Sequence, residues 1–210
     1  MDGMDGMDGM DGMGDDVRVL RSDDPEAQRL LDAGWRPVGE SWGARLRLGE
    51  PPALGPLRAL VARARDAGWT VRELGPDDDA DVVAHEAATR ADYPVTPATE
   101  PDVVTAEGLR RLRAEGHRAF GAVGAAGDLA AVTIVGRCDG RVETLWTSVR
   151  REHRRRGLAT AVKAASVLAL ADEGARVFGT GGAQVNAAVL AANARLGYVV
   201  EERWLSLRRA

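Results

Sequence analysis

The sequence predicts an α/β fold with a mixed sheet, and three observations carry that prediction. Helical and strand-like apolar patterns alternate over most of the 210 residues. The pair Asp139-Gly140 joins two strand-like runs, and such a pair is typical of a two-residue hairpin because both central residues of a type I′ turn need positive φ. An arginine-rich loop, residues 150–156, then separates a strand from a long helix. Antiparallel strands and strand–helix–strand units therefore share one sheet.

The amino-terminal tract, residues 1–13, repeats Met, Asp and Gly with a period of three. It cannot bury enough apolar surface to offset the entropy lost on ordering. We expect residues 1–14 to be disordered.

A strand–helix–strand–strand pattern follows over residues 15–50. A strand begins at Val17, and a helix is opened by Asp23 or Asp24, with Pro25 in its first turn. Gly34 closes that helix, and WRPVG and WGARLRL read as two short strands. We place a boundary after them, with a linker helix in residues 51–68.

The remaining segment, residues 69–210, is predicted to be the main domain. In order, we expect a strand at 69–74, helices at 79–91 and 103–115, three antiparallel strands (RAFGAV, DLAAVTIVGRC, RVETLWTSV), a helix ended by Gly174, a strand ARVFGT, a helix ended by Gly197, and two last strands around YVVEE and RWLSLR. Two strands joined through one helix are usually parallel neighbours.

Composition limits the function classes. A net charge of -4 and a pI of about 5.5 argue against a dedicated nucleic-acid binder. The single cysteine, Cys138, allows no intrachain disulfide, and no signal peptide or spanning apolar run is present. The three histidines have no ligand spacing, so we predict no metal site. We expect a cytoplasmic protein with no nucleic-acid or membrane partner.

The arginine-rich loop predicts an anion site. Five arginines and a histidine occupy six of the seven residues 150–156, and Gly157 follows them. A charge run is usually only a solvated face. Here it precedes a helix start, whose unpaired N–H groups and positive dipole end attract phosphate, while Gly157 permits close approach. We therefore predict a pyrophosphate at this helix start.

The loop also carries a family resemblance. No P-loop motif occurs, and GTGGAQ lacks the third glycine of a dinucleotide fingerprint. RRRGLA, as Arg154-x-x-Gly157-x-Ala159, resembles the acetyl-CoA signature of the Gcn5-related N-acetyltransferase (GNAT) family, and the element order from about residue 69 resembles its fold. The resemblance implies a GNAT-like acyl-CoA N-acyltransferase fold with acetyl-CoA as co-substrate. Its predicted binding residues are Val149, Arg154, Arg155, Arg156, Gly157, Leu158, Ala159, Thr160, Asn186 and Asn193.

The two asparagines come from the stretch QVNAAVLAANARLGY, where they are seven residues apart on one helical face. This stretch resembles the GNAT segment that borders CoA. Family members often carry tyrosine at the position of Asn193, where it protonates the departing thiolate. Asparagine cannot titrate, so the general acid stays open between Tyr198 and solvent.

The resemblance implies that an amine attacks the thioester directly in a ternary complex. A backbone N–H near Ser148 and Val149, assigned to Val149, would stabilise the oxyanion. Glu143 is the candidate base, pointing away from Trp146 by strand alternation, although an exposed strand carboxylate is often structural. The resemblance also implies that the loop DYPVTPATEPD, between the first two helices of the main domain, forms the acceptor wall. Its residues Tyr93, Glu100 and Asp102 would suit a cationic amine of a small molecule or peptide, although loops are polar in general. The alternatives are a non-catalytic acyl-CoA-binding or sensing domain, and a nucleic-acid contact of the arginine loop.

Residues 17–48 resemble residues 175–209, since AQRLLDAGW matches LAANARLGY in helix end, glycine and aromatic residue. We interpret them as a partial, half-GNAT-like module, with chance similarity as the alternative. A segment this small cannot bury its own core, because isolated domains below roughly 40 residues usually need disulfides, metals or partners. We therefore expect it to pack on the catalytic domain of its own chain or of a partner in a homodimer.

Overall fold

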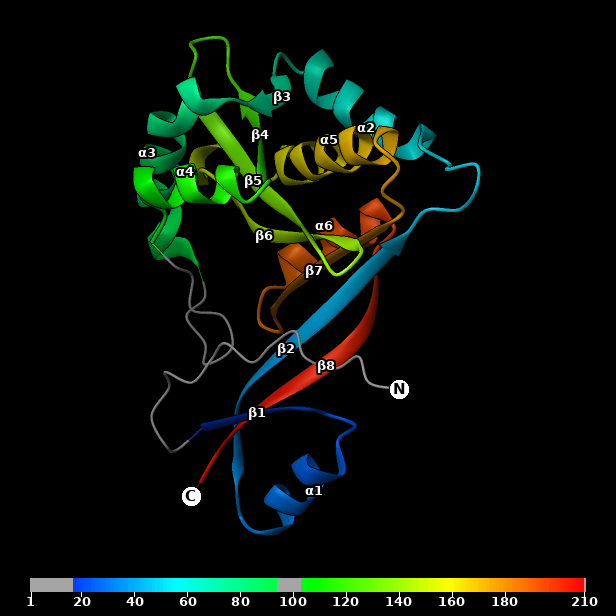
Figure 1. Ribbon diagram of the computed structural model, residues 1–210. Helices are drawn as coiled ribbons and strands as arrows, with labels where there is room; N and C mark the ends of the chain where they lie inside the picture. The colour runs from blue at the N-terminus through cyan, green and yellow to red at the C-terminus, as the bar shows by residue number, and fades with distance from the viewer. Residues whose placement is uncertain (1–16, 94–102, 210) are drawn as a thin grey trace.

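The protein is described here as a computed structural model covering residues 17–93 and 103–209 (Figure 1). It contains one eight-stranded sheet in the order β1-β8-β2-β7-β6-β5-β4-β3. The strands are β1 (Val17–Arg21), β2 (Arg36–Arg47), β3 (Thr70–Leu74), β4 (Arg118–Val123), β5 (Leu129–Cys138), β6 (Arg141–Val149), β7 (Val177–Ala183) and β8 (Val199–Arg208). The helices are α1 (Pro25–Asp32), α2 (Gly55–Asp66), α3 (Asp79–Thr89), α4 (Ala106–Ala114), α5 (Leu158–Asp172) and α6 (Ala187–Leu196). The predicted α/β class with a mixed sheet is confirmed.

The central meander forms as its turn chemistry predicts. β4, β5 and β6 pair antiparallel. Asp139 and Gly140 have φ values of 47° and 76°, as a type I′ turn requires. The connection from β6 through α5 to β7 gives the parallel pair of the sheet.

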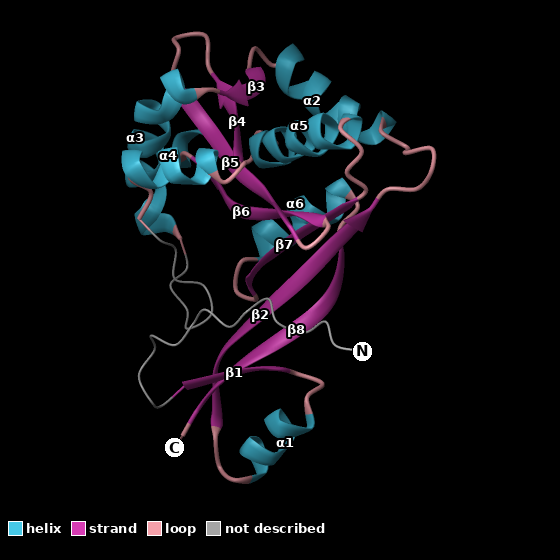
Figure 2. Cartoon of the chain, in the orientation of Figure 1, coloured by secondary structure: helices cyan, strands magenta, loops and turns pink. Residues whose placement is uncertain are grey.

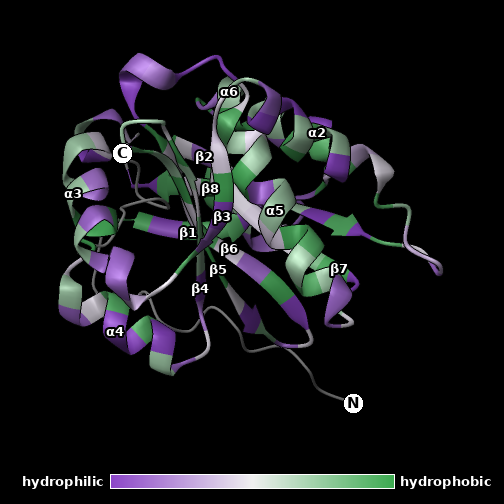
Figure 3. Cartoon of the chain, turned by 90° about the horizontal axis from the view of Figure 1, so that it is seen from above, coloured by the Kyte–Doolittle hydropathy of each residue, from purple (hydrophilic) through white to green (hydrophobic). Residues whose placement is uncertain are grey.

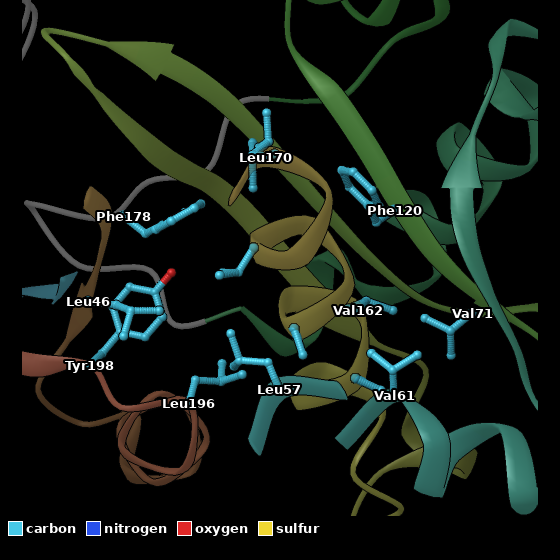
Figure 4. Close-up of a cluster of buried hydrophobic side chains, with 14 of the residues drawn as sticks. Leu46, Leu57, Val61, Val71, Phe120, Val162, Leu170, Phe178, Leu196 and Tyr198 are labelled. Atoms are coloured by element: carbon cyan, nitrogen blue, oxygen red, sulfur yellow. The ribbon is translucent and has the colours of Figure 1, made fainter. Parts of the chain in front are cut away.

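Helices cover the sheet on two sides (Figures 2 and 3). On one side α3 and α4 enclose Val82, Leu109, Ile134 and Trp146. On the other side α5 lies across the sheet and packs on α2 and α6. Figure 4 shows this larger core, in which Leu57 and Val61 of α2 face Val162 of α5.

The amino-terminal segment is built into the same sheet. β1 pairs with β8, and β2 lies between β7 and β8, antiparallel to both. Trp42 and Leu46 of β2 join the main core, and α2 contacts α5. The expected packing is therefore found within the chain itself, although the half-GNAT interpretation stays a hypothesis. The tract at residues 1–14 lies outside the described residues.

Two predicted strand pairs were wrong. WRPVG and WGARLRL form the single strand β2, and the last two predicted strands form the single strand β8. The β2–β8 ladder shifts register between Pro37 and Gly39 and continues beyond them, so the irregularity bends the strand without ending it. No helix in residues 17–93 and 103–209 meets the length and hydropathy that a membrane span requires.

Candidate active site

The candidate site is a cleft where two parallel strands separate. β6 and β7 pair only at Val142 with Phe178 and Glu143 with Gly179. Beyond these pairs the strands continue without bonding each other, and a cleft of about 490 Å³ opens at the gap. Its lining comes from residues 144–149 of β6, residues 153–155 and 157 of the loop, residues 158–160 and 163 of α5, residues 180 and 181 of β7, residues 186, 188, 189, 191–193 and 195 in and around α6, and Thr89, Asp92 and Tyr93.

A bulge in β6 sets which side chains face which way. The register shifts so that Trp146 lies opposite Ile134 and Glu143 opposite Gly136, leaving Leu145 as the extra residue. Since Ile134 and Gly136 share one face of β5, Glu143 and Trp146 also share a face. The prediction that they point to opposite faces was wrong, because strict alternation takes no account of the bulge.

The backbone beyond the bulge presents a donor to the cleft. The N–H of Arg150 donates to the carbonyl of Ala130 at 2.9 Å. Hydrogen-bonded and non-bonded pairs alternate along an antiparallel ladder. The preceding pair, Val149 with Ala131, is therefore non-bonded, and the N–H of Val149 points away from β5 toward the gap. This is the orientation that the predicted oxyanion donor needs.

The loop before α5 offers a row of unpaired N–H groups. Gly157 is the N-cap of α5 with a left-handed φ of 78°, and Arg155 has a φ of 62°. Within the described residues, no acceptor bonds the backbone N–H groups of residues 155–160. Leu158 is buried and anchors the helix start, while the Thr160 hydroxyl donates to the Gly157 carbonyl at 2.6 Å. The loop is thus a backbone cradle suited to phosphate oxygens.

Some arginines of the loop pair with groups of the protein, and others line hollows on its surface. Arg154 donates to the carbonyl of Val149 at 3.2 Å and to Asp92 at 2.6 Å, and Arg151 also pairs with Asp92. These arginines lower the pKa of Asp92. Arg155 lines the cleft, whereas Arg156 lines a smaller hollow beside it. Arg154 therefore shapes the loop through an internal carboxylate.

Both predicted asparagines line the cleft. Asn186 is the N-cap of α6, and its side chain accepts from the N–H of Val189 at 3.2 Å. It therefore precedes the helix, whereas the sequence had placed it within one. Asn193 is 2% exposed. Its Nδ2 has no partner among the described residues.

Lys163 is a cleft residue that sequence analysis did not assign to the site. It lies on α5, is 4% exposed, and donates to Asn193 Oδ1 at 2.7 Å and Thr180 Oγ1 at 3.0 Å. Its Nζ lies 5.1 Å from the ring centroid of Tyr198. Burial lowers the pKa of Lys163 to about 7, although Glu143 opposes the shift. The available signal was one lysine inside the otherwise uncharged run GLATAVKAASVLALA, since a lone buried charge needs partners.

A buried histidine reaches the cleft through Ser148. His85 is fully buried, with Nδ1 3.0 Å from the Leu129 carbonyl and Nε2 2.8 Å from Ser148 Oγ. Because a carbonyl only accepts, Nδ1 carries the proton and Nε2 accepts from the serine hydroxyl. Burial lowers the pKa of His85, which favours the neutral ring. The separation of 63 residues hid this pair from sequence analysis.

Glu143 is held by cations outside the cleft lining. Its carboxylate pairs with Arg141 and lies 3.9 Å from Arg45, over the space above Gly179. Its assignment as the base stays a prediction. Tyr198 is buried, and burial raises its pKa far above the ordinary value, which argues for a core role.

The acceptor loop is described only in part. Tyr93 lines the cleft, and burial raises its pKa. Glu100 and Asp102 lie outside the described residues. No group of three metal-ligating side chains occurs in the described part of the chain.

Solved structures share this architecture. A GCN5-related N-acetyltransferase from Sphaerobacter thermophilus is 19% identical over 92% of this chain and 58% of its own, with a TM-score of 0.67. A tandem GNAT protein from the clavulanic acid biosynthesis pathway is 25% identical over 91% of this chain and 61% of its own, with a TM-score of 0.57. An acetyltransferase from the GNAT family of Colwellia psychrerythraea is 16% identical over 93% of this chain and 65% of its own, with a TM-score of 0.61.

The sequence matches no family model and no curated protein. The chain spans less than two thirds of the length of these three structures. The chain therefore has the fold of the GCN5-related N-acetyltransferases.

Proposed function

We propose that the protein is an acetyl-CoA-dependent N-acetyltransferase that acetylates a primary amine of a small molecule or peptide. The observation that carries this proposal is the cleft between β6 and β7, which runs onto the unpaired N–H groups of residues 155–160. These groups would bind the pyrophosphate of acetyl-CoA, and Arg155 would add charge. The gap between the strands gives the linear arm of the donor a place beside Val149.

The reaction is direct acyl transfer within a ternary complex. The neutral amine attacks the thioester carbonyl, and the N–H of Val149 stabilises the oxyanion that forms. The carbon–sulfur bond then breaks, the nitrogen loses its extra proton to a base, and the thiolate gains a proton. The products are the amide and free CoA.

Two groups are candidates for the base. Glu143 is the predicted one, and the Ser148–His85 pair is the one that touches the cleft. A neutral His85 can accept a proton through the Ser148 hydroxyl, as a base must. If His85 is the base, we expect Ser148→Ala to lower the rate and to remove the fall in rate at low pH. If Glu143 is the base, we expect Glu143→Gln to have these two effects instead. Rates measured across pH for both variants decide between them.

The acceptor side of the cleft carries a carboxylate that is already paired. Asp92 lies on the lining with Tyr93, and Arg151 and Arg154 balance its charge and lower its pKa. Asp92 therefore does not decide the charge of the acceptor. A screen of diamines, amino acid amides, aminosugars and lysine-containing peptides, with CoA release as the readout, tests which amine is used.

Gly157→Glu tests the binding site directly. The glutamate places bulk and negative charge at the phosphate cradle, and the φ of 78° strains the new side chain. We expect acetyl-CoA binding to be abolished in a folded protein, as measured by calorimetry and circular dichroism. Gly49→Glu is the matched control, because Gly49 is exposed with open space around its Cα. Unchanged affinity in folded Gly157→Glu contradicts the proposal.

A non-catalytic acyl-CoA sensor is the alternative. Such a protein would bind acetyl-CoA but release no CoA with any amine. The neighbours of known structure named as acetyltransferases support the enzyme reading over this one.

A further inference from the structure

The cleft lacks a titratable side chain at the position of Asn193, yet the departing thiolate needs a proton. Lys163 lies against that position, since its Nζ donates to Asn193 Oδ1 at 2.7 Å. Its side chain comes from α5, six residues beyond Gly157, and reaches the lining between α6 and β7. A rise of about 1.5 Å per residue puts Lys163 roughly 9 Å along the helix from the phosphate cradle. A linear arm that leaves the cradle along α5 therefore passes this amine.

Two donors at this point have no acceptor. An ammonium group carries three protons, and Lys163 uses two of them, on Thr180 and Asn193. Asn193 is 2% exposed, and its Nδ2 also has no partner in the described part of the chain. Buried polar groups are rarely left unpaired in a native structure. Both residues line the cleft, so a ligand bound there can bring an acceptor to this point.

We propose that Lys163 is the general acid that protonates the leaving thiolate of CoA, with Asn193 holding its ammonium in place. This inference rests on the proposed acetyltransferase function. As the carbon–sulfur bond breaks, the electron pair stays on sulfur and the free N–H of the ammonium transfers its proton there. Neutral Lys163 then regains a proton from solvent or from the proton that the base removed from the amine.

The surroundings of Nζ suit this role. Glu143 on β6 is the charged group that raises its pKa, and the Tyr198 ring lies beside it, while Thr180 and Asn193 are neutral. Burial outweighs these and brings the pKa of Lys163 to about 7. The cysteine thiol has an ordinary pKa of about 8.5, so proton transfer from this ammonium to a thiolate of that kind is favourable. An acid with a pKa near the working pH is also effective.

Because Lys163 is the only lysine in the chain, its titration can be observed directly. We would incorporate lysine labelled with carbon-13 at Cε, which gives one side-chain NMR signal, and titrate the protein alone, with CoA and with dethio-CoA. We expect a midpoint near 7 in the free protein and with either ligand. With CoA alone we expect a second step in the same signal at the higher pH where the thiol ionises, because only CoA then places a sulfur anion beside Nζ. A CoA complex without this second step overturns the inference. Failure of CoA to bind would instead overturn the proposed function.

Kinetics give a second, independent test. We expect Lys163→Met to lower kcat by about 10²- to 10⁴-fold, the usual range for losing a general acid, while acetyl-CoA affinity is kept. Lys163→Arg keeps the positive charge but cannot give up its proton, so it should be equally slow. Adding Asn193→Tyr to Lys163→Met supplies a phenol near the same sulfur and should restore part of kcat. A folded Lys163→Met enzyme with unchanged kcat and pH profile refutes the assignment, as does full activity of Lys163→Arg.

Discussion

Two regions of the sheet have the same local architecture but differ in chemistry. The segments β1-α1-β2 and β7-α6-β8 each consist of a strand, a helix and a long strand. Each helix is followed by a glycine with a φ near 90° and then an aromatic residue, Gly34-Trp35 in one case and Gly197-Tyr198 in the other. β2 and β8 pair with each other, and the carboxyl-terminal half of each pairs with the first strand of the other segment. The two segments thus exchange their long strands reciprocally.

The difference lies in what flanks each segment. β7 has β6 on its other side, and the separation of these strands creates the cleft. β1 is the edge strand of the sheet, with no α5 or phosphate loop beside it. Where α6 carries Asn193, the corresponding turn of α1 carries Leu30 and Leu31. The comparison teaches that a strand–helix–strand unit does not make a cleft by itself. The cleft forms only where β6 and α5 lie beside the unit.

Deleting residues 1–50 removes one of the two compared segments and should have the largest effect on stability. The deletion removes β2 from between β7 and β8, so both strands lose their ladder and expose unpaired edges. We expect an insoluble or unfolded protein, assessed by solubility and thermal unfolding. Removing residues 1–14 alone is the control and should change neither stability nor activity. A soluble, monomeric and equally stable deletion protein would show that the amino-terminal segment is dispensable.

Substitution of Trp42 and of Trp35 compares the buried and the more exposed parts of the amino-terminal segment. Trp42 is 2% exposed and packs on Gly182 of β7, whereas Trp35 is only half-buried. We expect Trp42→Ala to lower the free energy of unfolding by about 3–5 kcal/mol, the usual cost of truncating a buried tryptophan. Trp35→Ala should cost clearly less. Denaturant unfolding of the two variants measures the difference, and equal losses would mean that the whole segment is held as tightly as the main core.

Lys163→Met should change how stability depends on pH. The folded-state pKa of about 7 lies below the ordinary lysine value, so between these two values the unfolded chain binds more protons. Wild-type stability should therefore gain about 1.4 kcal/mol per pH unit from this group as pH rises through that window. Below pH 7 the full cost of burying the cation remains. The methionine variant should lack this slope, and chemical unfolding at several pH values checks it; parallel slopes in both proteins would contradict a lowered pKa.

The sequence by itself determined most of the local turns and helix ends. Turn and cap chemistry is local, so Asp139-Gly140, Asp23 or Asp24, and Gly157 indicated a hairpin and two helix starts without knowledge of the fold. Both asparagines were predicted to border CoA, because the stretch around them resembles a known motif, and the structure places both on the cleft lining. These signals depend on residues close together in the chain.

Only the tertiary structure decided the rest, because it depends on pairings between distant residues. The joining of short strands into β2 and β8 follows from their mutual ladder, which no local turn signal reveals. The bulge at Leu145, which turns Glu143 and Trp146 to one face, depends on register with β5. The contacts of Lys163 with Thr180 and Asn193, and of His85 with Ser148, join groups that lie 17 to 63 residues apart. Burial, which sets the charge state of Lys163 and His85, is a property of the packed chain and not of its sequence alone.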